Sequence, residues 1–208
     1  MRLDVSFPAS VHRAPYPPDF LREAAVEFPK PDDPRWHVFQ GEHEPQKRQG
    51  GPDTWGPCTT QIMVDLMSAR FAHDVAHAIG HEGILYPDVY GGGLHLSGPG
   101  ARLDTHVDFN RHPHMGWRRK ANVLLYLNED WQPEWGGCLE LDRGAATIPP
   151  TMGTLVVFET SDRSWHGHPE PITDGHWRKS LAVYFYDVAD VVTVGEAHDT
   201  TWAGEPGT

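Results

Sequence analysis

The second half of the chain alternates between apolar and polar positions with a period of two, which is the pattern of β-strands. Glycine and proline separate the alternating runs, as expected for the turns of an antiparallel sheet. The runs cover residues 102–108, 121–127, 138–141, 154–159 and 179–187, with a weaker run at 191–194. Several short strands at this spacing predict a sandwich, a jelly roll or a barrel.

A helical pattern covers residues 69–79, ahead of the strands. Ser68 precedes it as a typical N-cap, and Gly80 follows it as a typical stop. The apolar side chains recur at intervals of four and share the face that we expect to pack on the core: Phe71, Val75 and Ile79.

The first 60 residues are rich in proline and contain one short helix signal, from about residue 19 to 28. Asp19, after two prolines, is the expected N-cap of this helix. We expect residues 29–57 to form a loop. The length fits one domain over residues 1–208, in which residues 1–90 supply helices and loops and residues 91–190 form the β-rich core.

The formal net charge is −12, from 17 basic and 29 acidic side chains. Such a chain is unsuited to neutralising phosphate groups, so we expect neither nucleic acid nor an anionic membrane as a partner. Its longest clearly apolar run, residues 181–186, is far shorter than the ~20 residues that span a bilayer. We therefore expect a soluble, cytoplasmic protein, and no pattern indicates its oligomeric state.

The chain contains 14 histidines, and their positions differ in what they predict. His73 and His77 are four residues apart on the predicted helix, on the side away from its apolar face, which indicates a solvated surface. His106 and Asp108 lie two residues apart in a predicted strand, so both side chains project to the same face. One more nitrogen ligand would complete a metal site of two histidines and one carboxylate, although an ion-paired surface strand would have the same spacing.

His166 follows the buried-looking run 155–158, and Arg178 begins the last clear strand. A guanidinium that enters an apolar strand is costly to bury unless a carboxylate meets it. A bound carboxylate would supply that partner; the alternative is that Arg178 lies at the surface and only ends the strand.

The order of these residues resembles the iron(II)- and 2-oxoglutarate-dependent dioxygenases, specifically their prolyl-4-hydroxylase-like branch. The resemblance covers about residues 91–187. The segments that carry it are residues 91–95 (GGGLH), 106–110 (HVDFN), 126–131 (YLNEDW), 135–141 (WGGCLEL) and 166–169 (HGHP). It implies a mainly β fold with flanking helices, the double-stranded β-helix or cupin-like jelly roll.

The same resemblance implies roles for five residues. His106, Asp108 and His166 would ligate Fe(II), while Arg178 and Tyr126 would hold the distal carboxylate of 2-oxoglutarate. The family places its third ligand directly after a serine and an aromatic residue, here Ser164 and Trp165, which favours His166. Spacing alone leaves His168 open as that ligand.

The resemblance also implies a reaction. With O2, the enzyme would convert 2-oxoglutarate to succinate and CO2 while it hydroxylates an unactivated C–H bond, with ascorbate as a candidate reductant. The substrate would be a small molecule, an amino acid or a peptidyl residue such as proline. Two alternatives stay open: a cupin-like metal enzyme that does not use 2-oxoglutarate, and an inactive oxygenase-like binding or sensor module.

Two further groups of residues stay ambiguous in the sequence. His95 comes shortly before the metal-binding strand and is a candidate substrate contact, with structural packing as the alternative. Arg118, Arg119 and Lys120 form a basic run that we interpret as solvated surface, with a patch for an acidic substrate group as the alternative.

Overall fold

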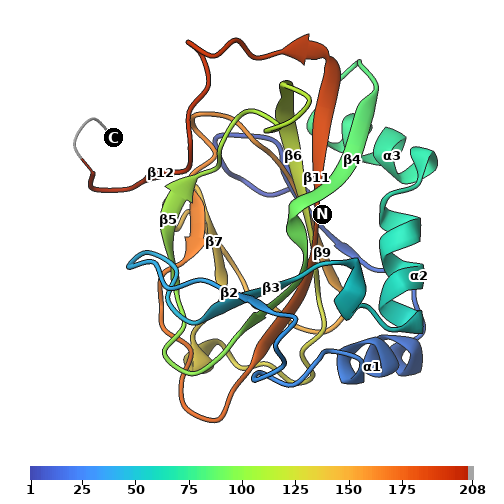
Figure 1. Ribbon diagram of the computed structural model, residues 1–208, viewed down its shortest axis with the longest axis vertical. Coiled ribbons are helices and arrows are strands. Elements are labelled where there is room, and N and C mark those ends of the chain that lie inside the picture. Colours follow the sequence, from blue (N-terminus) through green and yellow to red (C-terminus); the bar gives the residue numbers. More distant parts are fainter. Residues whose placement is uncertain (206–208) are drawn as a thin grey trace.

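The computed structural model describes residues 1–205, whose strands form two antiparallel sheets that face each other (Figure 1). The larger sheet has seven strands in the order β1-β9-β6-β11-β4-β3-β2. In that order their bounds are Ala9–Arg13, Thr154–Glu159, Trp117–Tyr126, Arg178–Val191, Leu85–Ser97, Lys47–Gly50 and His37–Val38.

The smaller sheet has five strands in the order β12-β5-β10-β7-β8. Their bounds are Thr201–Trp202, Leu103–Val107, His166–His168, Leu139–Leu141 and Ala146–Ile148. The two sheets form the double-stranded β-helix that the sequence predicts, so the expected fold class is confirmed.

Three helices, α1 (Pro18–Val26), α2 (Pro57–Leu66) and α3 (Ala69–Ile79), cover the outer face of the larger sheet (Figure 1). Two short 3-10 helices, Pro52–Thr54 and Pro133–Trp135, lie in the connections. No helix within residues 1–205 is long and apolar enough to cross a membrane.

Helix α3 matches its prediction closely. The Ser68 hydroxyl accepts a hydrogen bond from the Phe71 amide at 3.2 Å, and Gly80 ends the helix in the left-handed conformation at φ +73°. Val75 is buried against the sheet, whereas His73 and His77 are exposed.

Alternation along the central strands separates two environments. Val123 and Leu125 of β6, with Leu181 and Val183 of β11, belong to the core between the sheet and the helices. The residues between them face the opposite side, into the space between the two sheets. Polar side chains on that inner side therefore lie in the interior of the barrel, where the site described below is built.

Helix α2 begins at Pro57, where the expected loop over residues 29–57 ends, and the sequence pattern did not predict it. Two backbone amides in the first turn of α2 are capped by a residue distant in sequence. The Glu27 carboxylate at the end of α1 accepts hydrogen bonds from the amides of Cys58 and Thr59, both at 2.7 Å. Asp19 was expected to cap α1, and this is wrong: Pro17 occupies the N-cap, and Asp19 lies in the first turn.

The expected loop over residues 29–57 is also wrong in part, because it contains β2 and β3. Strand β3 has the polar sequence KRQG and no apolar alternation, and it exists because it pairs with residues 94–97 of β4. With β1, these strands show that residues 1–90 add strands to the larger sheet as well as helices and loops. The weak strand expected at 191–194 does not form, because β11 ends at Val191.

Candidate active site

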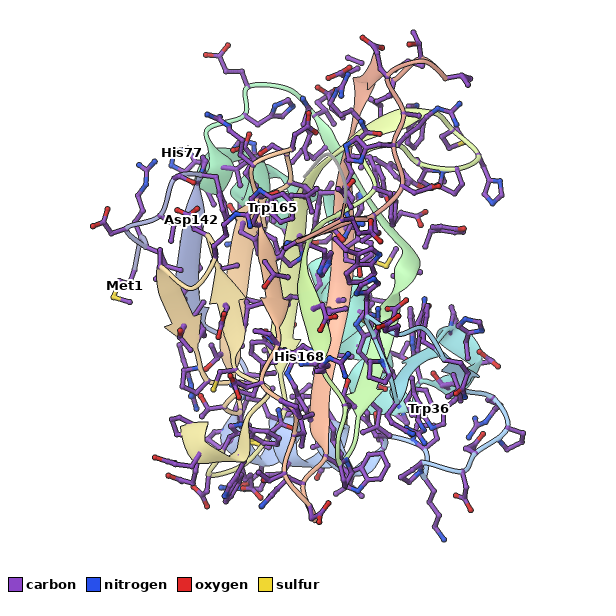
Figure 2. The ribbon with its side chains drawn as sticks, turned by 90° about the vertical axis from the view of Figure 1, so that its left-hand side faces the viewer. Met1, Trp36, His77, Asp142, Trp165 and His168 are labelled. Atoms are coloured by element: carbon purple, nitrogen blue, oxygen red, sulfur yellow. The ribbon has the colours of Figure 1, made fainter. Side chains whose placement is uncertain are left out.

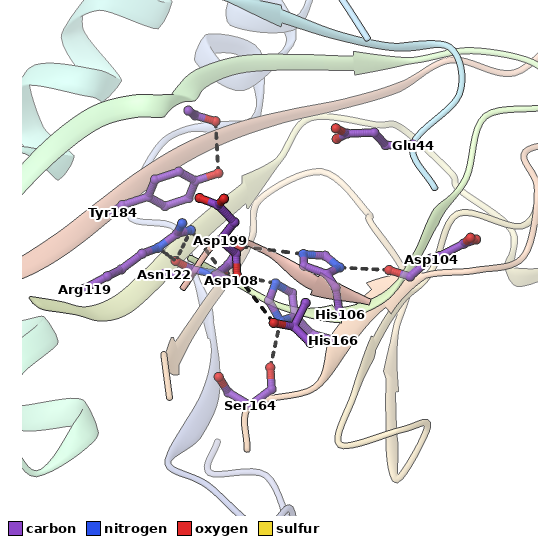
Figure 3. A network of polar contacts seen from close by, with 12 residues as sticks. Glu44, Asp104, His106, Asp108, Arg119, Asn122, Ser164, His166, Tyr184 and Asp199 are labelled. Carbon is purple, nitrogen blue, oxygen red and sulfur yellow. Dashed lines mark hydrogen bonds and ion pairs between the residues drawn. The ribbon is translucent and has the colours of Figure 1, made fainter. Parts of the chain in front are cut away.

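Three side chains converge between the sheets: His106 of β5, Asp108 just after it, and His166, which begins β10. The two strands are neighbours, and His166 lies directly opposite His106 in their pairing. His106 Nε2 is 3.6 Å from Asp108 Oδ1, and His166 Nε2 is 3.4 Å from Asp108 Oδ2 (Figure 3). One ligand atom from each residue lies within 4.8 Å of the other two, so a single ion can contact all three.

Backbone carbonyls determine which nitrogen each histidine presents. The Nδ1 atom of His106 is 2.8 Å from the Asp104 carbonyl, and that of His166 is 2.8 Å from the Ser164 carbonyl (Figure 3). A carbonyl only accepts hydrogen bonds, so each Nδ1 carries the proton and donates. The lone pair of each Nε2 is therefore free and directed toward Asp108, as a metal ligand requires.

The charges of the cluster also suit a cation. Burial raises the pKa of the Asp108 carboxyl, but the Arg119 guanidinium and the neighbouring histidines outweigh burial and hold this pKa well below its usual range. Burial lowers the pKa of His166 to about 4. At neutral pH the site thus offers one carboxylate and a neutral imidazole from His166, and metal ligands must be deprotonated in this way. Two imidazoles and one carboxylate are the donor set of non-haem Fe(II) oxygenases, so the residues fit iron.

Arg178 and Tyr126 contact each other on the inner side of the larger sheet. Arg178, the first residue of β11, is only 5% exposed; its Nε donates to the Gly137 carbonyl at 2.7 Å and its Nη2 to the Tyr126 hydroxyl at 3.1 Å. Of its five N–H groups, these contacts use two. Because Arg178 is buried, the surface alternative is wrong. No carboxylate within residues 1–205 forms an ion pair with Arg178, which leaves its charge available for a bound carboxylate.

A cavity of about 80 Å³ is lined by the three converging side chains and by Arg178. Its walls also include the small polar residues Ser97 and Ser180 and the apolar Leu139. A second cavity of about 570 Å³ shares His106, Asp108 and Arg119 with it. Aromatic side chains form much of the wall of this second cavity: His37, Phe39, Tyr90, Phe109 and Trp202.

Comparison with known families agrees with this geometry. Residues 92–186, the span from β4 to β11, match the model of the 2OG-Fe(II) oxygenase superfamily. This span is just under half of the chain, and over it the chain is similar to that superfamily. The superfamily is named for its use of Fe(II) and 2-oxoglutarate, and the donor set above fits that metal. No sequence among curated proteins matches the chain.

Solved structures show the same fold at low sequence identity. A Pseudomonas putida prolyl-4-hydroxylase aligns with a TM-score of 0.65 and 21% identity, over 88% of this chain and 94% of that chain. A Trichoplax adhaerens prolyl hydroxylase in complex with a peptide fragment of hypoxia inducible factor aligns with a TM-score of 0.57 and 13% identity, over 88% and 84% of the two chains. HygX from Streptomyces hygroscopicus, with nickel and 2-oxoglutarate bound, aligns with a TM-score of 0.55 and 12% identity, over 94% of each chain.

The two histidines whose roles the sequence left open, His95 and His168, both line the smaller cavity. His95 of β4 shares a hydrogen bond of 3.0 Å with the Gly91 carbonyl, and burial lowers its pKa to about 3. His168 lies in the interior near the middle of the molecule (Figure 2), and burial lowers its pKa well below its usual value. The group of converging ligand atoms contains His166 and not His168.

The interpretation of residues 118–120 as solvated surface is wrong for its middle member. Arg118 and Lys120 do lie at the surface, where both pair with Asp190. Arg119 is only 2% exposed, and its Nη2 lies 3.1 Å from Asp108 Oδ2. The contact of Arg119 with Asp108 was therefore missed, because simple alternation along the strand places Arg119 on the helix side of the sheet.

Proposed function

We propose that this protein hydroxylates an unactivated C–H bond and that five residues carry the reaction. His106, Asp108 and His166 hold Fe(II), and Arg178 and Tyr126 hold the distal carboxylate of 2-oxoglutarate. Bound Fe(II) would supply the activation of O2. One oxygen atom would enter succinate as 2-oxoglutarate loses CO2, and the other would enter the substrate. The observation that carries the proposal is the shared cavity, which places the Arg178 guanidinium and the three ligand side chains around one small space.

The contacts of Arg178 and Tyr126 suit a carboxylate. The Tyr126 hydroxyl accepts the Arg178 hydrogen bond, so its own proton stays available for donation. Burial raises the pKa of Tyr126, and the hydroxyl therefore remains protonated at neutral pH. Three N–H groups of Arg178 and this O–H can meet the two oxygens of one carboxylate, in a site whose burial strengthens each contact.

Asp108 supports hydroxylation as the outcome. Its carboxylate is one of the three converging donors and supplies a negative charge that balances a divalent ion. In the superfamily, halogenating members lack this carboxylate, and its absence leaves room for chloride. With Asp108 in place, hydroxyl transfer is the outcome that the donor set favours.

The larger cavity is the candidate substrate site. Its volume of about 570 Å³ suits a small molecule, an amino acid or one residue of a peptide, prolyl residues included. It reaches His106 and Asp108 directly, so a substrate in it lies next to the metal. The peptide complex of the Trichoplax adhaerens enzyme supports the peptidyl option for this fold.

A succinate-production screen tests the proposal. The Fe(II)-loaded protein is incubated in air with 2-oxoglutarate and a set of amino acids, peptides and small metabolites, and succinate above the substrate-free level is measured. We expect His106→Ala and Asp108→Ala to abolish substrate-dependent succinate, and His73→Ala, at an exposed histidine of α3, to retain it. Full activity in either site variant would overturn the proposal.

A further inference from the structure

The two oxygens of Asp108 have different surroundings. Oδ2 accepts a hydrogen bond of 2.7 Å from Asn122 Nδ2 and lies 3.1 Å from Arg119 Nη2 (Figure 3). Oδ1 receives no hydrogen bond within the part of the chain described, and it faces His106 Nε2 at 3.6 Å. Each oxygen faces one ligand nitrogen, because Oδ2 also lies 3.4 Å from His166 Nε2, but only Oδ2 is engaged by a hydrogen bond and an ion pair from β6.

Arg119 fixes the orientation of the Asn122 amide. Its Nε and Nη2 both donate to Asn122 Oδ1, at 3.0 and 2.7 Å. A guanidinium has donors and no acceptor, so the amide oxygen must face Arg119 and the amide nitrogen must face Asp108. The orientation of Asn122, and hence the donor that Asp108 receives, follows from this contact.

A β-bulge places both residues on the inner side of β6. In the pairing of β6 with β11, Ala121 lies opposite Phe185 and Arg119 lies opposite Tyr186, which leaves Lys120 as an extra residue. Arg119 and Asn122 are three positions apart and would otherwise point to opposite faces. The extra residue brings them together beside Asp108.

Aromatic rings hold the Arg119 guanidinium in place. Its central carbon lies 3.5 Å from the centre of the Tyr184 ring and 4.5 Å from that of Phe109. Stacking of this kind restrains a planar guanidinium as well as compensating for part of its lost hydration. The aromatic rings thus restrain Arg119, and Arg119 orients Asn122. Arg119 and Asn122 both contact Asp108 Oδ2.

We propose that Arg119 and Asn122 are positioning residues that make Asp108 bind the metal through Oδ1 alone. This inference rests on the proposed function, because it assumes that Asp108 is a metal ligand. A carboxylate that binds through both oxygens takes one more coordination position, and the facial triad is useful because it leaves three positions open. By engaging Oδ2 with their own N–H groups, the pair keeps a position available for the chelating co-substrate.

Two substitutions of nearly equal shape separate this role from simple packing. Asn122→Thr keeps a group that can both accept from Arg119 and donate to Asp108, whereas Asn122→Val has almost the same shape and no polar group. Both residues are favourable in a strand. Arg118→Gln, at the neighbouring surface arginine, is the control for a lost charge on β6.

The measurement is a titration of the metal-free proteins with Co(II), without 2-oxoglutarate, followed by visible absorption, whose bands depend on the number and arrangement of ligands. We expect Asn122→Val to weaken Co(II) binding by about 10-fold or more and to change the band pattern. Asn122→Thr and Arg118→Gln should stay within about threefold of the wild type, with its bands. Equal behaviour of the Val and Thr variants, whether both match the wild type or both are weakened alike, overturns the positioning role.

A further variant keeps the test decisive if Asn122→Val does not fold, as judged by circular dichroism. Arg119→Lys retains the charge but cannot donate to Asn122 and Asp108 in parallel, so we expect weaker Co(II) binding and altered bands; wild-type values would overturn the proposal. Failure of the proposed function has a different signature. In that case His106→Ala would bind Co(II) as tightly as the wild type, which removes the metal site and the positioning role with it.

Discussion

Replacement of Arg178 by glutamine weakens 2-oxoglutarate binding if this guanidinium holds the co-substrate. In the free protein, Arg178 donates to the Gly137 carbonyl and the Tyr126 hydroxyl and has no ion-pair partner among residues 1–205. Three of its N–H groups therefore remain for a ligand. Glutamine keeps a shorter polar side chain but removes the charge and the paired geometry.

The size of the effect follows from these contacts. A hydrogen bond to a charged group contributes about 1.5–3 kcal/mol, and two such bonds from one guanidinium are not fully additive. A loss of about 3 kcal/mol corresponds to roughly 100-fold weaker binding, at 1.36 kcal/mol per factor of ten. The position is 5% exposed, so little solvent screening reduces this figure.

Calorimetric titration of the Mn(II)-loaded protein with 2-oxoglutarate measures the change without turnover. The matched control is Lys179→Gln on the next residue of β11, whose ammonium group donates to the Ala25 carbonyl on the helix side. We expect the control to bind 2-oxoglutarate normally and both variants to bind Mn(II) normally. A dissociation constant within threefold of the wild type in a folded Arg178→Gln protein would refute the role of Arg178.

Two further predictions concern stability. Lowering the pH from 8 to 5 destabilises the metal-free protein, because the unfolded chain takes up protons near pH 6.5 that the buried imidazoles of His166 (pKa about 4) and His95 (pKa about 3) do not. The expected cost at pH 5, measured by urea unfolding, is about 2 kcal/mol for His166 and at most the same for His95. Equal stability at the two pH values would contradict this prediction. Glu27→Ala removes the carboxylate that accepts from the Cys58 and Thr59 amides, and it should lower the free energy of unfolding by about 1–2 kcal/mol. A change below about 0.3 kcal/mol in the same assay would show that the cap is not stabilising.

Local pattern predicted the parts of the molecule that depend on neighbours in sequence. The alternation over residues 121–127 and 154–159 matches β6 and β9, and Ser68 and Gly80 bound α3 as expected. The spacing of His106 and Asp108 places both side chains on the inner side of β5 for the same reason.

Features that depend on distant partners could not be predicted in this way. Strand β3 is polar and forms only because β4 offers an edge with which it pairs. Arg119 faces the site because of an extra residue in the pairing of β6 with β11, and no local pattern marks that bulge. The position of His166 opposite His106 is likewise a property of sheet pairing, which the resemblance to a family implied and the spacing alone did not.

The central claim is that His106, Asp108 and His166 hold an iron ion to which 2-oxoglutarate binds. Visible absorption of the Fe(II)-loaded protein, recorded without O2 as 2-oxoglutarate is added, tests it most directly. The account predicts a saturable new absorption in the wild type and none in His166→Ala, with His168→Gln retaining the ability to load iron. No spectral change in the wild type, or the same change in His166→Ala, would contradict the account.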